Sequence, residues 1–224
     1  MEYGNGFMYD VENDGLTVEQ NIGLPGQSRS GRLYRRVGKR TMDILLASAG
    51  LVVLFPLCLI IGIAVRLESS GPAIYRQERL GLNGREFMIL KFRSMVKDAE
   101  ACGPMWAEKD DCRVTHVGRF LRKSRLDELP QLINILSGDM SIVGPRPERR
   151  YFYDQFRRDI PDFDVRLRVK PGLTGLAQVS GGYDITPACK LKYDKKYMRH
   201  VTFWGDFLIL CRTFRVIFTG DGAR

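Results

Sequence analysis

An acid pair, Asp127-Glu128, lies where the sequence predicts the start of a helix. Proline is tolerated only in the first turn of a helix, so Pro130 places both acids at the N-terminal end of a helix over about 127–137. A helix N-terminus carries a partial positive charge and free N–H groups, so it attracts phosphate and lowers the pKa of a nearby carboxylate. Arg122 adds positive charge at the same end. The pair is therefore a candidate for phosphate chemistry, although Asp127 also suits an ordinary helix N-cap.

A stiff turn carrying one arginine follows this helix. Gly144-Pro145-Arg146-Pro147 restricts the backbone on both sides of Arg146, and Pro147 suits the first position of another helix. A guanidinium held near two carboxylates is what a pyrophosphate site needs, because it donates paired hydrogen bonds to phosphate oxygens. The chain has only two histidines, so a metal here would be a hard ion such as Mg²⁺, held by carboxylates. A structural ion pair of Arg146 is the alternative.

An uncharged apolar run, residues 44–65, indicates that these groups work at a membrane. At about 1.5 Å per residue, a straight helix of this length reaches roughly 33 Å, enough for a hydrocarbon core of about 30 Å. Basic residues flank both ends, however, and the positive-inside rule places both flanks in the cytoplasm. Pro56 would kink or break the helix and allow a re-entrant hairpin. From these features a single pass and a hairpin are equally supported.

The composition along the chain predicts three parts. Residues 1–33 are rich in glycine and polar residues, which is typical of a flexible tail. Residues 34–70 form a basic entry and the membrane helix. Residues 71–224 are expected to form one cytoplasmic domain, because a chain of this length leaves room for one core.

Two patterns within that domain predict its elements. Residues 73–79 and 87–95 read as strands of a hairpin, with a turn at 81–84. Residues 203–218 repeat aromatic and aliphatic side chains at helical spacing, which predicts an amphipathic helix. The apolar face of that helix suits either packing on the core or contact with the bilayer surface, and it could support a homodimer.

Taken in order, these residues form a series of motifs that resembles the bacterial sugar transferase family. These are the small monotopic phosphoglycosyl transferases, also called polyprenyl-phosphate hexose-1-phosphate transferases, and the resemblance covers about residues 34–219. The motifs are Lys39-Arg40, Asp43, Pro56, Gly71-Pro72, Arg76-Gln77-Glu78-Arg79, Lys91-Phe92-Arg93-Ser94-Met95, Leu126-Asp127-Glu128-Leu129-Pro130-Gln131-Leu132, Gly138-Asp139-Met140-Ser141, Gly144-Pro145-Arg146-Pro147 and Lys170-Pro171-Gly172-Leu173-Thr174-Gly175. One departure lies in residues 180–183, Ser-Gly-Gly-Tyr, where the family commonly has Gly-Arg.

The resemblance implies transfer of a sugar 1-phosphate from a UDP-sugar to undecaprenyl phosphate, with release of UMP. Asp127 would be the nucleophile that carries a covalent phosphosugar, and Glu128 would coordinate Mg²⁺. Arg122 and Arg146 would bind phosphate. The reaction would begin the assembly of an exopolysaccharide, a capsule or a glycoconjugate.

The resemblance also implies an architecture. The expected fold class is α+β and predominantly helical, in a monotopic membrane protein with an N-terminal re-entrant membrane helix, interfacial amphipathic helices and a small cytoplasmic catalytic domain. This expectation favours the hairpin over the single pass. The implied partners are the UDP-sugar, undecaprenyl phosphate and membrane lipid, at the cytoplasmic face of the bacterial inner (plasma) membrane.

Two other functions fit parts of the sequence. The net charge of +9 and the interleaved aromatic and basic residues of 149–158 suit nucleic acid, but no known recognition element accompanies them, so we expect no nucleic-acid partner. A catalytically idle membrane scaffold of a polysaccharide assembly complex is the alternative to the enzyme. The acid pair distinguishes these two, because only the enzyme depends on the Asp127 carboxylate.

Overall fold

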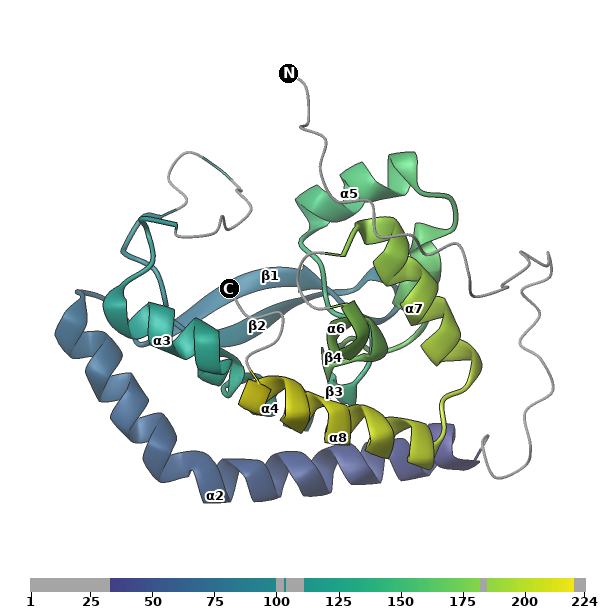
Figure 1. The fold of residues 1–224 in the computed structure, drawn as a ribbon, viewed down its shortest axis with the longest axis horizontal. Helices are drawn as coiled ribbons and strands as arrows, with labels where there is room; N and C mark the ends of the chain where they lie inside the picture. The colour runs from purple at the N-terminus through teal and green to yellow at the C-terminus, as the bar shows by residue number, and fades with distance from the viewer. Residues whose placement is uncertain (1–32, 100–102, 104–110, 182–184, 220–224) are drawn as a thin grey trace.

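The computed structural model describes residues 33–99, 103, 111–181 and 185–219 of the 224-residue chain. Helices predominate, and two small two-stranded sheets lie among them (Figure 1). The α-helices are α2 (Lys39–Glu68), α3 (His116–Ser124), α4 (Gln131–Ser137), α5 (Arg150–Asp159), α6 (Leu176–Gly181), α7 (Pro187–Arg199) and α8 (Phe203–Thr219). The strands are β1 (Ile74–Leu80), β2 (Glu86–Phe92), β3 (Ser141–Val143) and β4 (Gly172–Thr174), and the shorter helical turns are η1 (Tyr34–Gly38), η2 (Leu82–Gly84), η3 (Leu126–Glu128) and η4 (Phe163–Arg168). The predominantly helical fold is confirmed, and the predicted tail lies outside the described residues except for Leu33.

The predicted apolar helix is α2, a helix of 30 residues with Pro56 inside it. Its ribbon bends part-way along its length (Figure 1), and a proline that lacks an N–H and crowds the preceding turn is the usual cause of such a bend. Among the described residues, this helix is long and apolar enough to cross a membrane. Val52 and Phe55 in its middle are 76% and 65% exposed, whereas Ala47 and Val65 nearer its ends are buried. An apolar surface is thus exposed between two packed ends.

Both ends of α2 are bound to the same folded body. Near the N-terminal end, the Asp43 carboxylate accepts a hydrogen bond from the Ser141 hydroxyl of β3 (3.0 Å). At the C-terminal end, the Arg93 guanidinium donates to the carbonyl oxygens of Ser69 (2.6 Å) and Ser70 (2.9 Å). A cation at this position also complements the negative end of the helix dipole. The exposed middle of α2 therefore projects from a body that holds both of its ends.

β1 and β2 form the predicted antiparallel hairpin, with Gln77 opposite Ile89. The turn between them is η2, in which Asn83 takes a left-handed backbone conformation (φ 56°), a conformation that asparagine tolerates well. Phe87 and Ile89 of β2 enter the main core together with Ile135 of α4. The hairpin is thereby packed against the helix that follows the acid pair.

β3 and β4 form a short parallel pair, with Ser141 opposite Gly172 and Val143 opposite Thr174. The two backbones come so close that a Cβ at Gly172 would lie 2.1 Å from the amide nitrogen of Gly144. A side chain cannot occupy that space, so glycine is required there. This contact fixes the start of the Gly144-Pro145-Arg146-Pro147 turn against the strand that follows Lys170-Pro171.

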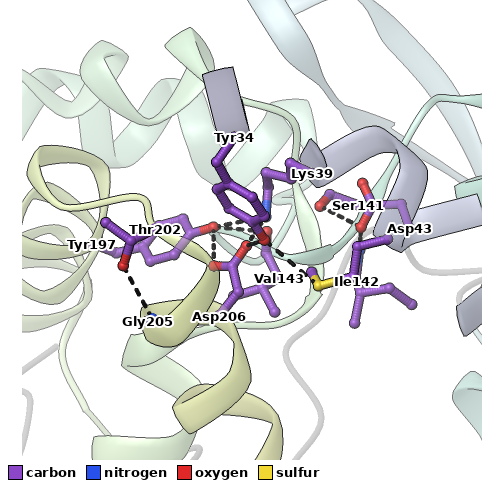
Figure 2. Close-up of polar contacts among 11 residues, drawn as sticks. Tyr34, Lys39, Asp43, Ser141, Ile142, Val143, Tyr197, Thr202, Gly205 and Asp206 are labelled. Atoms are coloured by element: carbon purple, nitrogen blue, oxygen red, sulfur yellow. Dashed lines mark hydrogen bonds and ion pairs between the residues drawn. The ribbon is translucent and has the colours of Figure 1, made fainter. Parts of the chain in front are cut away.

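A buried polar network fastens α7 and α8 to the beginning of α2 (Figure 2). The carboxylate of Asp206 is fully buried and accepts hydrogen bonds from the hydroxyls of Tyr34 (2.7 Å) and Tyr197 (2.9 Å). The ammonium group of Lys39 completes the cluster at 2.6 Å from the same carboxylate. Because a buried charge is tolerated only when it is paired and hydrogen-bonded, this cluster holds the four segments together as a unit.

α8 agrees with the helix predicted over 203–218, and its two faces lie in different surroundings. Asp206 and Ile209 are buried, whereas Phe203, Trp204 and Phe207 are exposed. The three exposed rings contact one another, with Trp204 centred 5.6 Å from Phe203 and 5.9 Å from Phe207. Packing on the core is confirmed for one face, and contact of the aromatic face with a bilayer stays a prediction.

Asp206→Asn is expected to destabilise the protein by about 3–5 kcal/mol, because it removes the fully buried carboxylate that pairs with the partly buried Lys39. Urea unfolding in one detergent, followed by tryptophan fluorescence, measures this loss. The matched control is Glu86→Gln, which removes an exposed ion pair with Arg150 and should cost far less stability, because solvent screens such a pair. Equal losses in the two variants would contradict the role given to Asp206.

Candidate active site

Asp127 and Glu128 lie in η3, a 3₁₀ turn that precedes α4, so the prediction of one continuous helix from Asp127 is wrong. The cause is Pro130, which has no N–H to donate to the Leu126 carbonyl as an α-helix would require. The turn closes instead through the shorter-range bond from the Leu129 N–H to that carbonyl (3.3 Å). The acid pair therefore precedes the helix and does not belong to its first turn.

Glu128 is held between two cations. Its Oε1 atom accepts from the Lys91 ammonium group at 2.8 Å and from Arg146 Nη2 at 2.5 Å, and its Oε2 atom lies 3.3 Å from Arg146 Nη1. Burial by itself would raise the pKa of Glu128, but the charges and hydrogen bonds of Arg146 and Lys91 outweigh it and hold the pKa below its ordinary value. Glu128 is therefore a fixed anion.

Asp127 has different surroundings, although it is the adjacent residue. Its side chain is buried at 8% exposure, and within the described residues no side chain donates a hydrogen bond to its carboxylate. Burial raises the pKa of Asp127 to about 6, against the lowering effect of Lys91, Arg146 and Arg122. The expectation that the helix start lowers this pKa is thus wrong, because loss of solvent outweighs the nearby positive charges. The carboxylate is still mostly ionised at neutral pH, and its lone pairs are available.

Arg146 lies on a turn whose backbone carbonyls accept hydrogen bonds from two other arginines. Arg166 donates to the carbonyl of Arg146 (3.0 Å), and Arg79 donates to the carbonyl of Pro147 (3.1 Å). Arg166 is itself fixed by a buried ion pair with Asp194 (2.6 Å). The prediction that Pro147 begins a helix is wrong, since α5 begins at Arg150 and the residues before it remain extended or irregular. The turn is rigid because of its prolines and these backbone contacts.

Arg122 reaches the site from α3. Its Nε atom donates to the Ser94 hydroxyl at 2.9 Å, just beyond the end of β2. One turn earlier, a Cβ at Gly118 would lie 2.0 Å from the Ser94 carbonyl oxygen, so only glycine allows α3 to approach the strand this closely. The structure thus brings all four predicted site residues into one region, with Arg122 and Arg146 both close enough to influence the charge of Asp127.

Lys91 is a site residue that the sequence reasoning left out. Its position did carry a signal, because Phe87, Ile89 and Lys91 alternate along β2 and the first two are buried. A lysine on the apolar face of a strand needs a buried partner, and here that partner is Glu128. The sequence departure at 180–183 gives no comparable information, because residues 182–184 lie outside the described part of the chain.

The acid pair has the donor chemistry that magnesium prefers. Across the described residues, no group of three or more His, Cys, Asp or Glu side chains is gathered for a metal. Magnesium in phosphate-handling sites commonly takes one or two carboxylates and completes its shell with substrate phosphates and water. In the described part of the chain, Glu128 Oε2 bears only the longer bond to Arg146, and the Asp127 carboxylate accepts no side-chain hydrogen bond. These residues therefore fit an ion brought in with a diphosphate.

The sequence is similar to that of several known proteins. The sequence profile of the family described as "Bacterial sugar transferase" matches residues 34–220. UDP-N-acetylgalactosamine-undecaprenyl-phosphate N-acetylgalactosaminephosphotransferase of Aeromonas hydrophila is 47% identical over 190 residues, covering 83% of this chain and 45% of the relative. UDP-glucose:undecaprenyl-phosphate glucose-1-phosphate transferase of Caulobacter vibrioides is 42% identical over 190 residues, covering 83% of this chain and 71% of the relative. Undecaprenyl-phosphate galactose phosphotransferase of Salmonella typhimurium is 39% identical over 232 residues, covering 97% of this chain and 46% of the relative.

The chain thus spans about half the length of two of these relatives and more than two thirds of the third. The matched region includes the acid pair, both predicted phosphate-binding arginines and the whole of α2. A match this long, in a single ordered stretch, identifies more than a shared fold. The chain belongs to the bacterial sugar transferase family.

Proposed function

We propose that this protein transfers a sugar 1-phosphate from a UDP-sugar to undecaprenyl phosphate and releases UMP. The names of its relatives support the acceptor and the type of reaction, and they differ in the sugar, which is N-acetylgalactosamine, glucose or galactose. The observation that carries the proposal is the contrast within the acid pair. Asp127 is buried and accepts no side-chain hydrogen bond from the described residues, beside a Glu128 that two cations hold in place.

In the proposed first step, an Asp127 carboxylate oxygen attacks the phosphorus that bears the sugar. A bond forms between that oxygen and phosphorus, the bond from phosphorus to the bridging oxygen breaks, and UMP leaves with the electron pair. An oxygen of the lipid phosphate then attacks the same phosphorus and releases Asp127 as a carboxylate. A phosphoanhydride provides its own leaving group, so neither step requires a histidine base. Arg146 and Arg122 would bind phosphate oxygens in both steps.

Glu128 would hold Mg²⁺ together with the donor diphosphate, and the ion when bound would neutralise negative charge on the phosphates. Lys91 and Arg146 then have a further task, because they orient the Glu128 carboxylate before any ligand arrives. A carboxylate that is already oriented does not have to be ordered during the reaction.

The same proposal gives the protein a monotopic place in the membrane, with α2 as a re-entrant helix. The bend in α2 (Figure 1), the attachment of both its ends to one body and its exposed apolar middle support this topology. A straight crossing would place the two ends on opposite sides of the bilayer, which one folded body cannot bind. The aromatic face of α8 would lie at the bilayer surface, where amphipathic rings are favoured.

The site would then face the cytoplasm of a bacterial cell, at the inner membrane, where basic flanks are retained and UDP-sugars are available. There the reaction would begin an exopolysaccharide, capsule or glycoconjugate by loading the first sugar onto the lipid.

The test of this function is UMP release by detergent-purified protein, given Mg²⁺, undecaprenyl phosphate and a panel of UDP-sugars that includes UDP-N-acetylgalactosamine, UDP-glucose and UDP-galactose. Steady release with one donor, dependent on the lipid, is expected. If folded protein releases no UMP with any donor, the catalytically idle scaffold becomes the better account.

Asp127→Asn should lower turnover by more than about 10³-fold, because the amide cannot attack phosphorus. It should also abolish the radiolabel that wild-type protein retains after incubation with donor carrying ³²P in the sugar phosphate, without lipid. Asp139→Asn is the matched control, since this residue lies beyond α4 and outside the acid pair. Normal turnover by Asp127→Asn would remove Asp127 as the nucleophile.

Arg146→Lys keeps the charge but loses the bidentate hydrogen bonding of the guanidinium to Glu128. We therefore expect kcat/KM to fall by roughly 10-fold or more. Initial rates of UMP release measure the effect. Arg150→Lys, a change of the same kind at an exposed ion pair, should leave kcat/KM within about twofold of wild type. A similar response of the two variants would show that Arg146 has no special place in the site.

The topology is tested with single cysteines at two exposed positions in a cysteine-free background: Val37 in η1, just before the apolar helix, and Leu67 at the C-terminal end of that helix. In intact spheroplasts, neither position should react with a thiol reagent that cannot cross membranes, and both should react after lysis. Labelling of one end from outside would establish a single pass and overturn the re-entrant helix.

A further inference from the structure

Asn134, in the middle of α4, binds the backbone of β2 with both ends of its side-chain amide. Its Oδ1 atom accepts from the Leu90 N–H at 3.0 Å, and its Nδ2 atom donates to the Met88 carbonyl at 2.8 Å. The side chain is buried, with 4% of the residue exposed. A buried amide is costly unless its groups are hydrogen-bonded, and here both the donor and the acceptor are used.

This contact takes the place of a neighbouring strand. β2 pairs with β1 along one edge, and the hairpin is a sheet of two strands, so the other edge of β2 offers unpaired backbone groups. The amide of Asn134 presents one donor and one acceptor to that edge, as a strand residue would. It is therefore specific for one register of β2, because a slip by one residue would move the strand about 3.3 Å and turn its side chains to the opposite face.

The register matters because the next residue is Lys91. Its ammonium group pairs with Glu128 Oε1 at 2.8 Å, and Glu128 lies just before α4, the helix that carries Asn134. Two contacts therefore join β2 to this part of the chain. One is the pair of hydrogen bonds made by the Asn134 amide in the middle of α4, and the other is the Lys91–Glu128 ion pair just before α4. The two hydrogen bonds of the Asn134 amide determine which residue of β2 faces the acid pair.

We propose that Asn134 is a positioning residue of the transferase, which fixes β2 against α4 so that Lys91 meets Glu128. The proposal rests on the proposed function and adds a residue that does not touch the reacting atoms. A purely space-filling role would favour an apolar side chain at a position this buried, whereas the amide matches two specific backbone groups.

The experiment uses the first half-reaction, the burst of UMP that protein releases from donor in the absence of lipid. Burst amplitude counts competent molecules, and the burst rate constant measures their chemistry. Asn134→Ala should lower the rate constant by roughly 10-fold or more, because a misplacement of about 1 Å at a catalytic group is costly. The double variant Asn134→Ala with Lys91→Met should lose no more than Lys91→Met alone, since both changes remove the same interaction.

Ser137→Ala is the control on the same helix, because its hydroxyl bonds the Asn134 carbonyl and not β2. It should leave both amplitude and rate constant unchanged. If Asn134→Ala does not fold, Asn134→Ser replaces it, since a hydroxyl can still satisfy one of the two backbone groups. A normal rate constant in the competent molecules of the folded variant, or losses that multiply in the double variant, would overturn the proposal.

A second measurement does not depend on turnover. Amine-reactive labelling followed by mass spectrometry should find Lys91 protected in wild-type protein and reactive in the Asn134 variant. Lys39 is an internal reference, because it is paired with Asp206 at a distant site and should stay protected in both proteins. Loss of protection at both lysines would indicate general loosening and would overturn the positioning role. Absence of a UMP burst in wild-type protein would instead contradict the proposed function, so the two failures are distinguishable.

Discussion

Adjacent buried carboxylates must be compensated by positive charge, and this constraint organises the catalytic face of the protein. An uncompensated ion in a protein interior costs several kcal/mol. Here Glu128 receives Lys91 from β2 and Arg146 from the turn after β3, so three segments far apart in sequence meet at one carboxylate. Arg79 and Arg166 then hold the turn through its backbone carbonyls. One arginine, Arg146, thus binds the acid, and two others, Arg79 and Arg166, bind the turn that carries Arg146.

The apolar helix and the acid pair belong to one structural unit, because both depend on α4. Arg40, near the start of α2, donates to the carbonyl oxygens of Ile135 (2.5 Å) and Leu136 (2.8 Å) at the C-terminal end of α4. Both carbonyls lie in the last turn of α4, where the Ile135 carbonyl also accepts from the Gly138 N–H at 3.1 Å. The Arg40 cation adds a second donor there and complements the helix dipole. Further along α2, Gly50 leaves room for Leu132 of α4. Seating α2 in a membrane would therefore also fix the height of the acid pair above it.

Elements with strong local patterns could be predicted from the sequence, and the pairing of charges could not. The hairpin, the apolar helix and the helix over 203–218 each carry their own periodicity and their own turn residues. Lys91, Arg93 and Arg79 look alike in the sequence, yet one pairs with Glu128, one binds the end of α2 and one supports the Arg146 turn. These roles depend on contacts between distant segments, which no local pattern contains. The four predicted site residues lie in one region, and the roles that the family resemblance implies for them stay predictions.

The contrast between Asp127 and Glu128 shows why a local electrostatic rule was insufficient. A helix start and nearby cations were expected to lower the pKa of both acids, but the pKa is lowered for Glu128 alone, by the charges and hydrogen bonds of Arg146 and Lys91. Asp127 lies among the same cations without bonding to them, so burial and the negative charge of Glu128 raise its pKa. The lowered pKa of Glu128 and the raised pKa of Asp127 suit different tasks. A carboxylate fixed by cations is a weak nucleophile but a well-oriented ligand, whereas an unshared carboxylate with a raised pKa is more basic and still ionised near neutral pH. Adjacent residues can divide the chemistry because, among the residues that the structure describes, Glu128 has charged partners and Asp127 has none bonded to it.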